Sequence, residues 1–374
     1  MNLILFLSFN RSLKDWYNEK TLSRELFYYS NFSKKYNIKI SIFSYGDSTD
    51  YQYLKNTNLD VITLYRKKKR KSKFINFFYS IFFIIKNRKI FKKFVIMKTN
   101  QNYGSWLAIL LKIIYPKMIL VSRNGYDLYF NKIQDGNFIK SLLAYIICFL
   151  SYKLSDHIFV SSSYLKKFVS KKFKINLSKI TILSNYINTN QFKPLNLKKR
   201  KRKSVLYVGR FEPEKNLFDL IYTFSNTDYS LEFYGHGTLE NDLKQYAKIN
   251  NTKLKIFKPV KNFLLPRVYN KYEFFILNSI YEGNPKVLLE AMSCKLICLG
   301  KNVNGINDII ANNCNGILFD QSTSVLNKIK LLKKNSLKFK IGNNSRKYIL
   351  NNHTFEIIQY KEINIYEKLF KRKN

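Results

Sequence analysis

The chain has 374 residues, of which 46% are hydrophobic and 16% aromatic, and its 66 Lys and Arg against 24 Asp and Glu give a formal net charge of +42. This apolar content excludes a disordered chain, and the length favours two domains of roughly 150 to 200 residues each. An AT-rich coding sequence, which enriches Lys, Asn, Ile, Phe and Tyr, accounts for part of the charge. The remainder favours phosphate-rich or membrane partners, because positive potential attracts anions.

Short apolar runs alternate with helical patterns along the whole chain, which is typical of parallel strands joined by crossover helices. In the first half these runs are residues 3–9, 38–45, 94–99, 118–123, 157–162 and 179–185. In the second half they are residues 203–210, 229–235, 253–259, 273–279, 295–301 and 316–320. The sequence therefore predicts an α/β protein with two doubly wound, Rossmann-like halves. Ligands are expected outside the carboxyl ends of the strands, with the cleft between the halves as the default site.

The predicted domain borders follow the composition of the connecting segments. Residues 193–203 are polar, basic and contain a proline, as expected of an exposed linker. We therefore expect an N-terminal domain at 1–195, a basic linker at 196–203 and a C-terminal domain at 204–352. The last segment, 353–374, has a helical apolar pattern without a following strand, and packing back onto the N-terminal domain is one option for it.

Hydropathy and cysteine spacing exclude two further classes of protein. The longest uncharged apolar windows, residues 74–85, 99–111 and 141–152, are shorter than the roughly 18 residues that span a bilayer. The first residues lack the charge order and cleavage site of a secretory signal, so a cytoplasmic protein is expected. The four cysteines have no metal-ligand spacing with the histidines and are predicted to be buried thiols: Cys148, Cys294, Cys298 and Cys314.

A dense cationic run, residues 65–73, directly precedes the apolar and aromatic stretch 74–85. Adjacent basic and apolar segments favour a helix that lies on an anionic membrane surface. The alternative is a solvated loop that leads into a helix packed on the sheet. For the apolar stretch by itself, burial is the simpler interpretation.

The segment "VGRFEPEKN", residues 208–216, ends a predicted strand at Gly209 and places Arg210 and Lys215 in the following turn. A planar guanidinium fork and a mobile ammonium together suit a diphosphate. Taken alone, two solvated cations in a basic chain are the simpler interpretation. A second strand end carries Gly235 and Gly237, and this G-x-G pattern is a weak signal for close backbone approach to a ligand.

The segment "YEGNPKVLLEAMSC", residues 281–294, contains a predicted helix start at Pro285, since proline is favoured in the first helical turn. Free N–H groups around Lys286 and Val287 would then form an anion site reinforced by the helix dipole. Glu282 precedes this site and Glu290 follows it within the helix. Carboxylates accept hydrogen bonds from sugar hydroxyls, so the pair fits a nucleotide sugar; a capped helix with two unrelated glutamates is the alternative.

Together with "NGINDIIANNCNGILF", these motifs resemble the C-terminal domain of the family 4 glycosyltransferases of GT-B fold, over roughly residues 204–320. The resemblance implies a hexosyltransferase that retains anomeric configuration and needs no cofactor or metal. By position, Arg210 and Lys215 would hold the donor diphosphate, Glu282 would contact the donor sugar and Glu290 the ribose. The remaining implied donor-binding residues are Gly209, Gly235, Gly237, Gly283, Asn284, Pro285, Lys286 and Val287.

The N-terminal half departs from the family pattern at two places. The Gly-Gly that often follows the first strand is absent, and Asn124 stands where many members carry a histidine. Since Asn cannot accept a proton as a base, Asp127 and Arg123 are the better candidates for charge-stabilising or acceptor-orienting groups beside Glu282. The alternative is a simple turn at a strand end around Gly125. A further departure, in residues 293–300, is expected to alter only a turn.

The leading hypothesis is transfer of a sugar from a nucleoside-diphosphate sugar to a lipid-linked or polysaccharide acceptor in cell-surface glycan biosynthesis, such as lipopolysaccharide, O-antigen or capsule. The protein would be peripheral on the inner face of the cell membrane. Alternatives are a sugar-nucleotide epimerase or a phosphorylase of the same fold. The charge of +42 also suggests a nucleic-acid-binding protein, but no recognition helix, RNP aromatics or zinc finger is present, so no nucleic-acid partner is expected.

Overall fold

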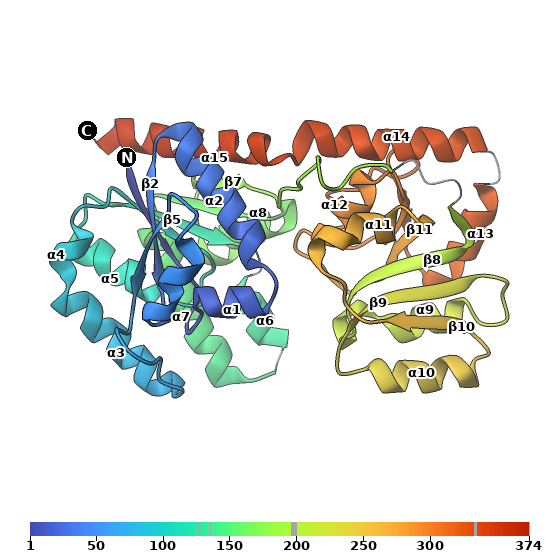
Figure 1. Cartoon of the computed structure of the whole chain (residues 1–374), viewed down its shortest axis with the longest axis horizontal. Helices are drawn as coiled ribbons and strands as arrows, with labels where there is room; N and C mark the ends of the chain where they lie inside the picture. Colours follow the sequence, from blue (N-terminus) through green and yellow to red (C-terminus); the bar gives the residue numbers. More distant parts are fainter. Residues whose placement is uncertain (126, 135, 196–199, 333–334, 374) are drawn as a thin grey trace. The chain divides into compact units, whose positions relative to one another are not determined.

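The computed structural model describes residues 1–125, 127–134, 136–195, 200–332 and 335–373. The chain forms two compact units: unit 1 is Met1–Leu183 together with Gln359–Asn374, and unit 2 is Ser184–Ile358. Each unit contains one parallel β-sheet with helical connections (Figure 1).

Unit 1 has a seven-stranded parallel sheet in the order β3-β2-β1-β4-β5-β6-β7. Its strands are β1 Asn2–Phe6, β2 Lys39–Ser44, β3 Asp60–Thr63, β4 Ile96–Thr99, β5 Ile119–Asn124, β6 His157–Val160 and β7 Ile180–Ile182. Its helices are α1 Leu13–Asn18, α2 Leu22–Tyr36, α3 Lys73–Lys86, α4 Arg88–Phe91, α5 Trp106–Ile114, α6 Leu128–Gln134, α7 Phe138–Leu154 and α8 Ser163–Phe173, with most of α15, Phe355–Lys373. The central strands are apolar because both sheet faces are covered: Leu3, Ile4, Leu5 and Phe6 of β1 are all buried.

Strand β3 is the one element of this sheet that the apolar pattern did not predict. It has four residues, at the edge of the sheet, and pairs only with β2, from Ser41 opposite Asp60 to Ser44 opposite Thr63. Of its residues only Val61 is buried. A short edge strand buries little side-chain surface, so its sequence lacks the continuous apolar run of a central strand.

Unit 2 has a six-stranded parallel sheet in the order β10-β9-β8-β11-β12-β13. Its strands are β8 Lys201–Arg210, β9 Ser230–His236, β10 Lys253–Phe257, β11 Tyr272–Leu277, β12 Ile297–Lys301 and β13 Ile317–Phe319. Its helices are α9 Leu217–Thr223, α10 Glu240–Ile249, α11 Leu265–Tyr269, α12 Lys286–Ser293, α13 Val325–Leu331 and α14 Asn335–Asn352. A single apolar core spans the unit, and β8 and β9 pair in register from Ser204 opposite Ser230 to Arg210 opposite His236.

The segment expected as a basic linker is only partly described. Residues 196–199 lie outside the described residues. Lys201–Lys203, expected at the end of the linker, belong instead to strand β8. The backbone N–H of Lys201 donates to the carbonyl of Lys271, and its ammonium pairs with Glu232 at 2.8 Å. These contacts offset the low strand propensity of a charged segment.

Helix α15 docks in unit 1 through a buried cluster of charged and phenolic groups. Glu362 accepts hydrogen bonds from Lys98 of β4, from Tyr28 of α2 at 2.8 Å and from Tyr366 of its own helix. The side chains of Lys98 and Glu362 are each 1% exposed. Burial raises the pKa of Glu362, but the pairing with Lys98 and the phenol hydrogen bonds outweigh it and lower the pKa. This cluster therefore fixes the carboxyl-terminal helix on the sheet of unit 1.

Two expectations about burial need correction. Cys314 is exposed, whereas Cys148, Cys294 and Cys298 are buried and free; Cys314 lies in a turn among asparagines, where no core can form around it. Helix α3 follows the simpler interpretation, a helix packed on the sheet, only in part: Ile84 is buried and Phe77, Tyr79, Ile81 and Phe83 pack against the core, whereas Phe74, Phe78 and Phe82 are exposed. Within the described part of the chain, no helix is both long and apolar enough to span a membrane.

Candidate functional site

The sheet of unit 2 reverses its strand order between β8 and β11, which is the topological switch point where open α/β sheets bind ligands. The loops that follow these two strands meet there. The backbone N–H of Ile280, after β11, donates to the carbonyl of Glu214, after β8, at 2.9 Å. The N–H of Glu282 donates to the carbonyl of Asn304, after β12, at 3.3 Å. The loops after β8, β11 and β12 thus lie together at one edge of the sheet.

Lys215 and Glu282 form an ion pair at this edge. The ammonium Nζ of Lys215 lies 2.7 Å from Oε1 of Glu282, and the two side chains are 15% and 12% exposed. The hydroxyl of Ser279 donates to the same oxygen at 2.7 Å. The structure therefore joins two residues that the sequence singled out in separate motifs. Ser279 escaped notice because a serine at a strand end carries no distinctive signal.

Helix α12 begins beside this pair. It starts at Lys286, next to Pro285 as predicted, and Pro285 occupies the N-cap position in an extended conformation with ψ of 110°. The side chain of Pro285 forms no capping hydrogen bond at this helix start. The N-cap residue thus supplies no oxygen that would compete with a bound anion at the positive end of the helix dipole, in front of Lys286 and Val287.

Glu290 lies on the same helix in a buried environment. It is 5% exposed, and its Oε2 accepts a hydrogen bond from the hydroxyl of Tyr269 at 2.9 Å. Burial and the neighbouring Glu290 raise the pKa of Tyr269 well above its ordinary value, so the phenol remains a donor. Tyr269 therefore orients the Glu290 carboxylate, a role that its position in an apolar pattern did not suggest.

Arg210 lies farther into solvent than Lys215. Its guanidinium pairs with Glu214 at 2.8 Å, and its side chain is 66% exposed against 22% for Glu214. Exposed pairs of this kind contribute little stability, so the guanidinium can exchange partners at low cost. Arg210, expected in the turn, is thus the last residue of β8 and accessible, whereas Lys215 lies in the turn that follows and is fixed against Glu282.

The glycines at this edge permit close approach of backbone segments. A Cβ at Gly235 would lie 1.8 Å from the carbonyl oxygen of Gly209, and one at Gly237 would lie 2.3 Å from that of Phe211. Gly305, which was not assigned a role, has a φ of +83°, and a Cβ there would lie 2.2 Å from the carbonyl oxygen of Glu282. Gly305 therefore lets the loop after β12 press against Glu282, and any side chain would push that loop away.

Asn284 is held by another part of unit 2. Its Oδ1 accepts from the backbone N–H of Asn185 at 2.8 Å, and its carbonyl accepts from the Asn185 side chain at 2.6 Å. The carbonyl of Asn185 is in turn 3.1 Å from Nδ1 of His353. Asn185 and His353 thus fix the turn that carries Gly283, Asn284 and Pro285. Sequence reasoning missed both because they lie far from the motif.

The candidates in unit 1 do not come together. Asp127 is fully buried and accepts from Asn124 at 3.0 Å, from Tyr152 at 2.5 Å and from the backbone N–H of Phe130 at 2.8 Å. Burial raises the pKa of Asp127. These contacts make its carboxyl group an anchor for the start of α6.

Arg123 precedes Asn124 in β5, so its side chain leaves the opposite face of the sheet. Burial disfavours its charge, but Tyr29, Glu25 and Glu362 outweigh this and raise the pKa of Arg123. Its environment is therefore that of α2 and α15, away from the Asp127 cluster. The functional roles predicted for Arg123 and Asp127 remain predictions.

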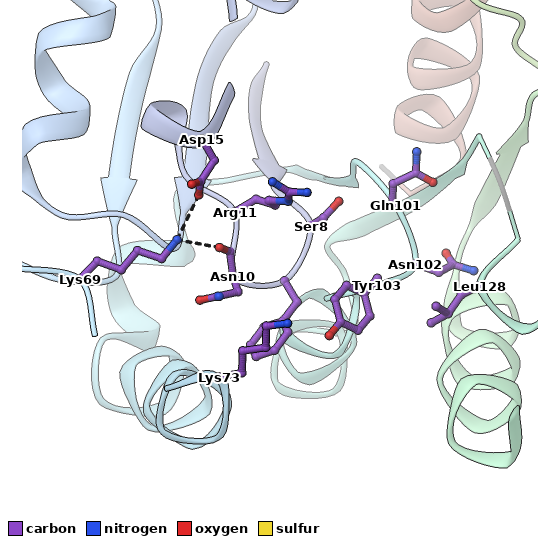
Figure 2. Close-up of a pocket in the computed structure, with 11 residues that line it drawn as sticks. Ser8, Asn10, Arg11, Asp15, Lys69, Lys73, Gln101, Asn102, Tyr103 and Leu128 are labelled. Atoms are coloured by element: carbon purple, nitrogen blue, oxygen red, sulfur yellow. Dashed lines mark hydrogen bonds and ion pairs between the residues drawn. The ribbon is translucent and has the colours of Figure 1, made fainter. Parts of the chain in front are cut away.

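A polar pocket of about 620 Å³ lies at the switch point of unit 1, between β1 and β4 (Figure 2). Its lining includes Ser8, Asn10 and Arg11 after β1, and Gln101, Asn102 and Tyr103 after β4, with Asp15, Lys69 and Lys73. The ammonium of Lys69 donates to the carbonyl of Asn10 at 2.7 Å and to Asp15 at 3.0 Å, as Figure 2 shows. Lys69 and Lys73 belong to the cationic run 65–73, and the other lining residues belonged to no predicted site. Among the described residues, no group of three or more His, Cys, Asp or Glu side chains could hold a metal.

Two Rossmann-like units with parallel sheets define the GT-B fold, and solved structures of this class match over the whole chain. The glycosyltransferase from Rickettsia africae ESF-5 is 17% identical, with 99% of both chains covered and a TM-score of 0.76. Anabaena HepE, solved with UDP and glucose, is 13% identical, with 98% of this chain and 99% of HepE covered and a TM-score of 0.74. At these identities the likeness shows the fold.

Residues 188–348 match the family described as "Glycosyl transferases group 1". The chain is 29% identical over 176 residues to the UDP-Gal:alpha-D-GlcNAc-diphosphoundecaprenol alpha-1,3-galactosyltransferase of Escherichia coli, covering 41% of this chain and 45% of that protein. It is 30% identical over 168 residues to the N-acetylgalactosamine-N,N'-diacetylbacillosaminyl-diphospho-undecaprenol 4-alpha-N-acetylgalactosaminyltransferase of Campylobacter jejuni, covering 43% and 46%. The alignments thus span less than half of each relative. The residues that match this family lie within unit 2, and the Lys215–Glu282 edge lies among them.

Proposed function

We propose that the protein is a retaining glycosyltransferase that moves a sugar from a nucleoside-diphosphate sugar to a lipid-linked or polysaccharide acceptor in cell-surface glycan biosynthesis. In this proposal unit 2 binds the donor and unit 1 the acceptor. The observation that carries it is the Lys215–Glu282 pair beside the uncapped start of α12, at the switch point of a sheet within a group 1 glycosyl transferase domain.

The geometry of this edge suits each part of a nucleotide sugar. The start of α12 favours the diphosphate, and an ammonium has three donors, so Lys215 can hold a phosphate oxygen while it still contacts Glu282. Glu282 accepts hydrogen bonds only, which fits it to the hydroxyls of the donor sugar. Glu290, oriented by Tyr269, is assigned to the ribose hydroxyls. Arg210 is assigned to the diphosphate from the solvent side.

The chemical step follows from these contacts. The bond between the anomeric carbon and the diphosphate oxygen breaks, and the acceptor hydroxyl forms a new glycosidic bond on the same face of the sugar. The departing phosphate oxygen takes the proton of that hydroxyl. Lys215, Arg210 and the α12 dipole stabilise the negative charge that develops on the leaving group, while Glu282 fixes the sugar. No metal or further cofactor is assigned to this step.

The acceptor and the location are proposed from two lines of support. The names of the relatives from Escherichia coli and Campylobacter jejuni describe acceptors linked to a diphospho-undecaprenol lipid. The basic run 65–73 and the exposed aromatic residues of α3 provide cationic and apolar surface for an anionic bilayer. We therefore assign the protein to the inner face of the cell membrane as a peripheral enzyme.

Donor binding is the direct test. Thermal unfolding would be followed with UDP-, GDP-, ADP- and dTDP-sugars, and one class of nucleotide is expected to raise the midpoint. Turnover would then be measured as release of the nucleoside diphosphate in the presence of membrane extract. Glu282→Gln keeps the size of the side chain but removes its charge, and it is expected to lower turnover by roughly 10²- to 10³-fold.

The matched control is Glu240→Gln, which removes an exposed carboxylate paired with Lys244 on α10 of the same unit. Its turnover should equal that of the unaltered protein. The proposal fails if the folded protein is stabilised by none of the nucleotide sugars, or if Glu282→Gln turns over as fast as Glu240→Gln.

A further inference from the structure

An apolar groove of about 890 Å³ lies next to the polar pocket of unit 1. Its walls are Phe74, Phe77 and Phe78 of α3, Trp106 of α5, and Leu143 and Ile147 of α7. The groove and the polar pocket have four lining residues in common: Phe9, Lys73, Tyr103 and Leu128. The two hollows therefore adjoin, with the polar one at the switch point and the apolar one between helices.

The apolar wall results from the fixed orientation of α3. Asn76 and Ser80 are fully buried, whereas Phe74 and Phe78 are 73% and 54% exposed. The side chain of Asn76 contacts Tyr65 and Asn10 and donates to the carbonyl of Arg70 at 3.1 Å. These contacts fix the rotation of the helix, so that Phe77, Tyr79 and Phe83 pack against the core while Phe74 and Phe78 face away from it. The helix thus has one apolar side packed on the unit and a second, aromatic side that is exposed.

The polar pocket at the other end carries a surplus of positive charge. The described residues of its lining include three cations, Arg11, Lys69 and Lys73, and one carboxylate, Asp15. Arg11 also forms an exposed ion pair with Glu19, a kind of pair that contributes little stability and can be exchanged for a bound anion. Burial raises the pKa of Asp15, but hydrogen bonds from Ser12 and Lys69 outweigh it and lower the pKa, so this carboxylate stays charged and neutralises one cation. Lys73 lines both hollows and stands where they join. Further lysines, Lys132 and Lys140, line the groove.

We propose that the pocket and the groove form one site for a membrane lipid with a phosphate or diphosphate head and a long hydrocarbon chain. The head lies in the polar pocket against Lys73 and Arg11, and the first part of the chain lies in the groove against Phe78, Trp106 and Leu143. This inference rests on the proposed function and names the chemistry of its acceptor. Charge complementarity favours an anionic head, and the shared wall of the two hollows lets the head and the chain of one molecule occupy both.

The test uses a short-chain probe that stays soluble. Farnesyl diphosphate, farnesol and inorganic diphosphate would be titrated by calorimetry into the full-length protein. Farnesyl diphosphate is expected to bind at least about tenfold more tightly than either of the others, because only it fills both hollows. It should also shift the emission of Trp106, one of the two tryptophans of the chain.

Two phenylalanines of α3 provide matched variants. Phe78 lines the groove and is 54% exposed; Phe82, one turn farther along, is 55% exposed and is not among the described residues that line the groove. Phe78→Ser is expected to weaken farnesyl diphosphate binding about tenfold, and Phe82→Ser to leave it within about twofold. Lys73→Gln should reduce the preference for farnesyl diphosphate over farnesol, since it removes a cation at the junction.

The inference is overturned if Phe78→Ser and Phe82→Ser weaken binding equally, or if farnesol binds as tightly as farnesyl diphosphate. Either result would make this face a general apolar surface. The titrations contain no nucleotide sugar, so their outcome is independent of donor binding by unit 2. A protein that discriminates the probes but is stabilised by no nucleotide sugar would disprove the transferase proposal and leave the lipid site standing.

Discussion

Both units place polar residues at the switch point of a parallel sheet, but an ion pair fills this place in unit 2, whereas a pocket opens there in unit 1. In unit 2 the switch point between β8 and β11 holds Lys215 against Glu282, and both side chains are largely buried. In unit 1 the switch point between β1 and β4 opens into a pocket of about 620 Å³ with more cations than carboxylates. The first arrangement suits a ligand with hydroxyls and phosphates, and the second suits an anion.

The helices around the two sites differ as well. In unit 2, α10 buries Leu243 and Ala247 and turns its charged residues to solvent. In unit 1, α3 buries Asn76, Ser80 and Ile84 but leaves Phe74, Phe78 and Phe82 exposed. A parallel sheet with crossover helices therefore does not determine whether the outer side of a helix is polar or apolar. Among the described residues, exposed large apolar side chains gather on α3 and α7, whereas α10 exposes Ile249.

The largest expected effect tests how unit 1 is held together. Glu362→Ala removes the acceptor that Lys98, Tyr28 and Tyr366 share, and leaves the Lys98 ammonium unpaired in a buried site. Loss of one partner of a buried pair costs about 3 to 5 kcal/mol of unfolding free energy. Hydrogen exchange should then increase in β4 of unit 1 and stay slow in β11 of unit 2.

A double variant separates charge from packing at this cluster. Lys98→Met with Glu362→Gln removes both charges and retains a carbonyl oxygen for the two phenols. It is expected to recover most of the stability that Glu362→Ala loses, because replacing both members of a buried pair is often neutral. Equal increases of hydrogen exchange in both units of Glu362→Ala would contradict the prediction that this cluster stabilises unit 1 alone.

The next largest expected effect is the loss of unfolding free energy in unit 1 at acid pH, which results from protonation of His157. Burial, together with the positive charges of Lys166, Arg372 and Lys179, lowers the pKa of His157 to about 4. The unfolded chain takes up this proton near pH 6.5, whereas the folded chain resists it. The neutral imidazole therefore contributes its full stability above about pH 6.5, and this stability is lost as the pH falls toward 4, by on the order of 3 kcal/mol.

Chemical denaturation at a series of pH values measures this contribution. His157→Gln keeps a group that can bond Thr181, which lies 2.9 Å from the imidazole, but it cannot titrate. The variant should show a shallower loss of stability than the unaltered protein between pH 6.5 and 4. Parallel curves for the two proteins would contradict the prediction.

Sequence reasoning reached the unit 2 site because its motifs follow the strands of a parallel sheet. Lys215 and Glu282 are 67 positions apart, yet both lie just after strands that end at the same edge. The partners that orient the site, Ser279, Asn185 and Gly305, could not be predicted in the same way. Their contacts depend on how loops far apart in sequence pack together, which no local pattern records.

The unit 1 candidates were harder to predict for a physical reason. Adjacent strand residues point to opposite faces, so Arg123 and the Asn124–Asp127 pair could have been separated by strand alternation alone. The pocket residues Asn10 and Arg11 gave no signal, because single polar residues in loops are common, and Lys69 was noted only as part of the cationic run 65–73. The aromatic residues of α3 were visible in the sequence, but their outward orientation depends on Asn76, whose buried partners only the fold supplies.

The smallest expected effect concerns membrane contact outside the groove and compares equal changes in the two units. Phe82 and Ile85 of α3 are 55% and 44% exposed, and Ile249 of α10 in unit 2 is 81% exposed. Phe82→Ser with Ile85→Ser is expected to weaken sedimentation with anionic phospholipid vesicles several-fold, since apolar area that enters the bilayer is lost. Ile249→Ser should leave sedimentation unchanged although it alters the more exposed residue, because α10 lacks the neighbouring basic run. Equal losses would mean that exposed apolar residues anywhere on this basic protein promote binding, and that α3 is not a dedicated membrane surface.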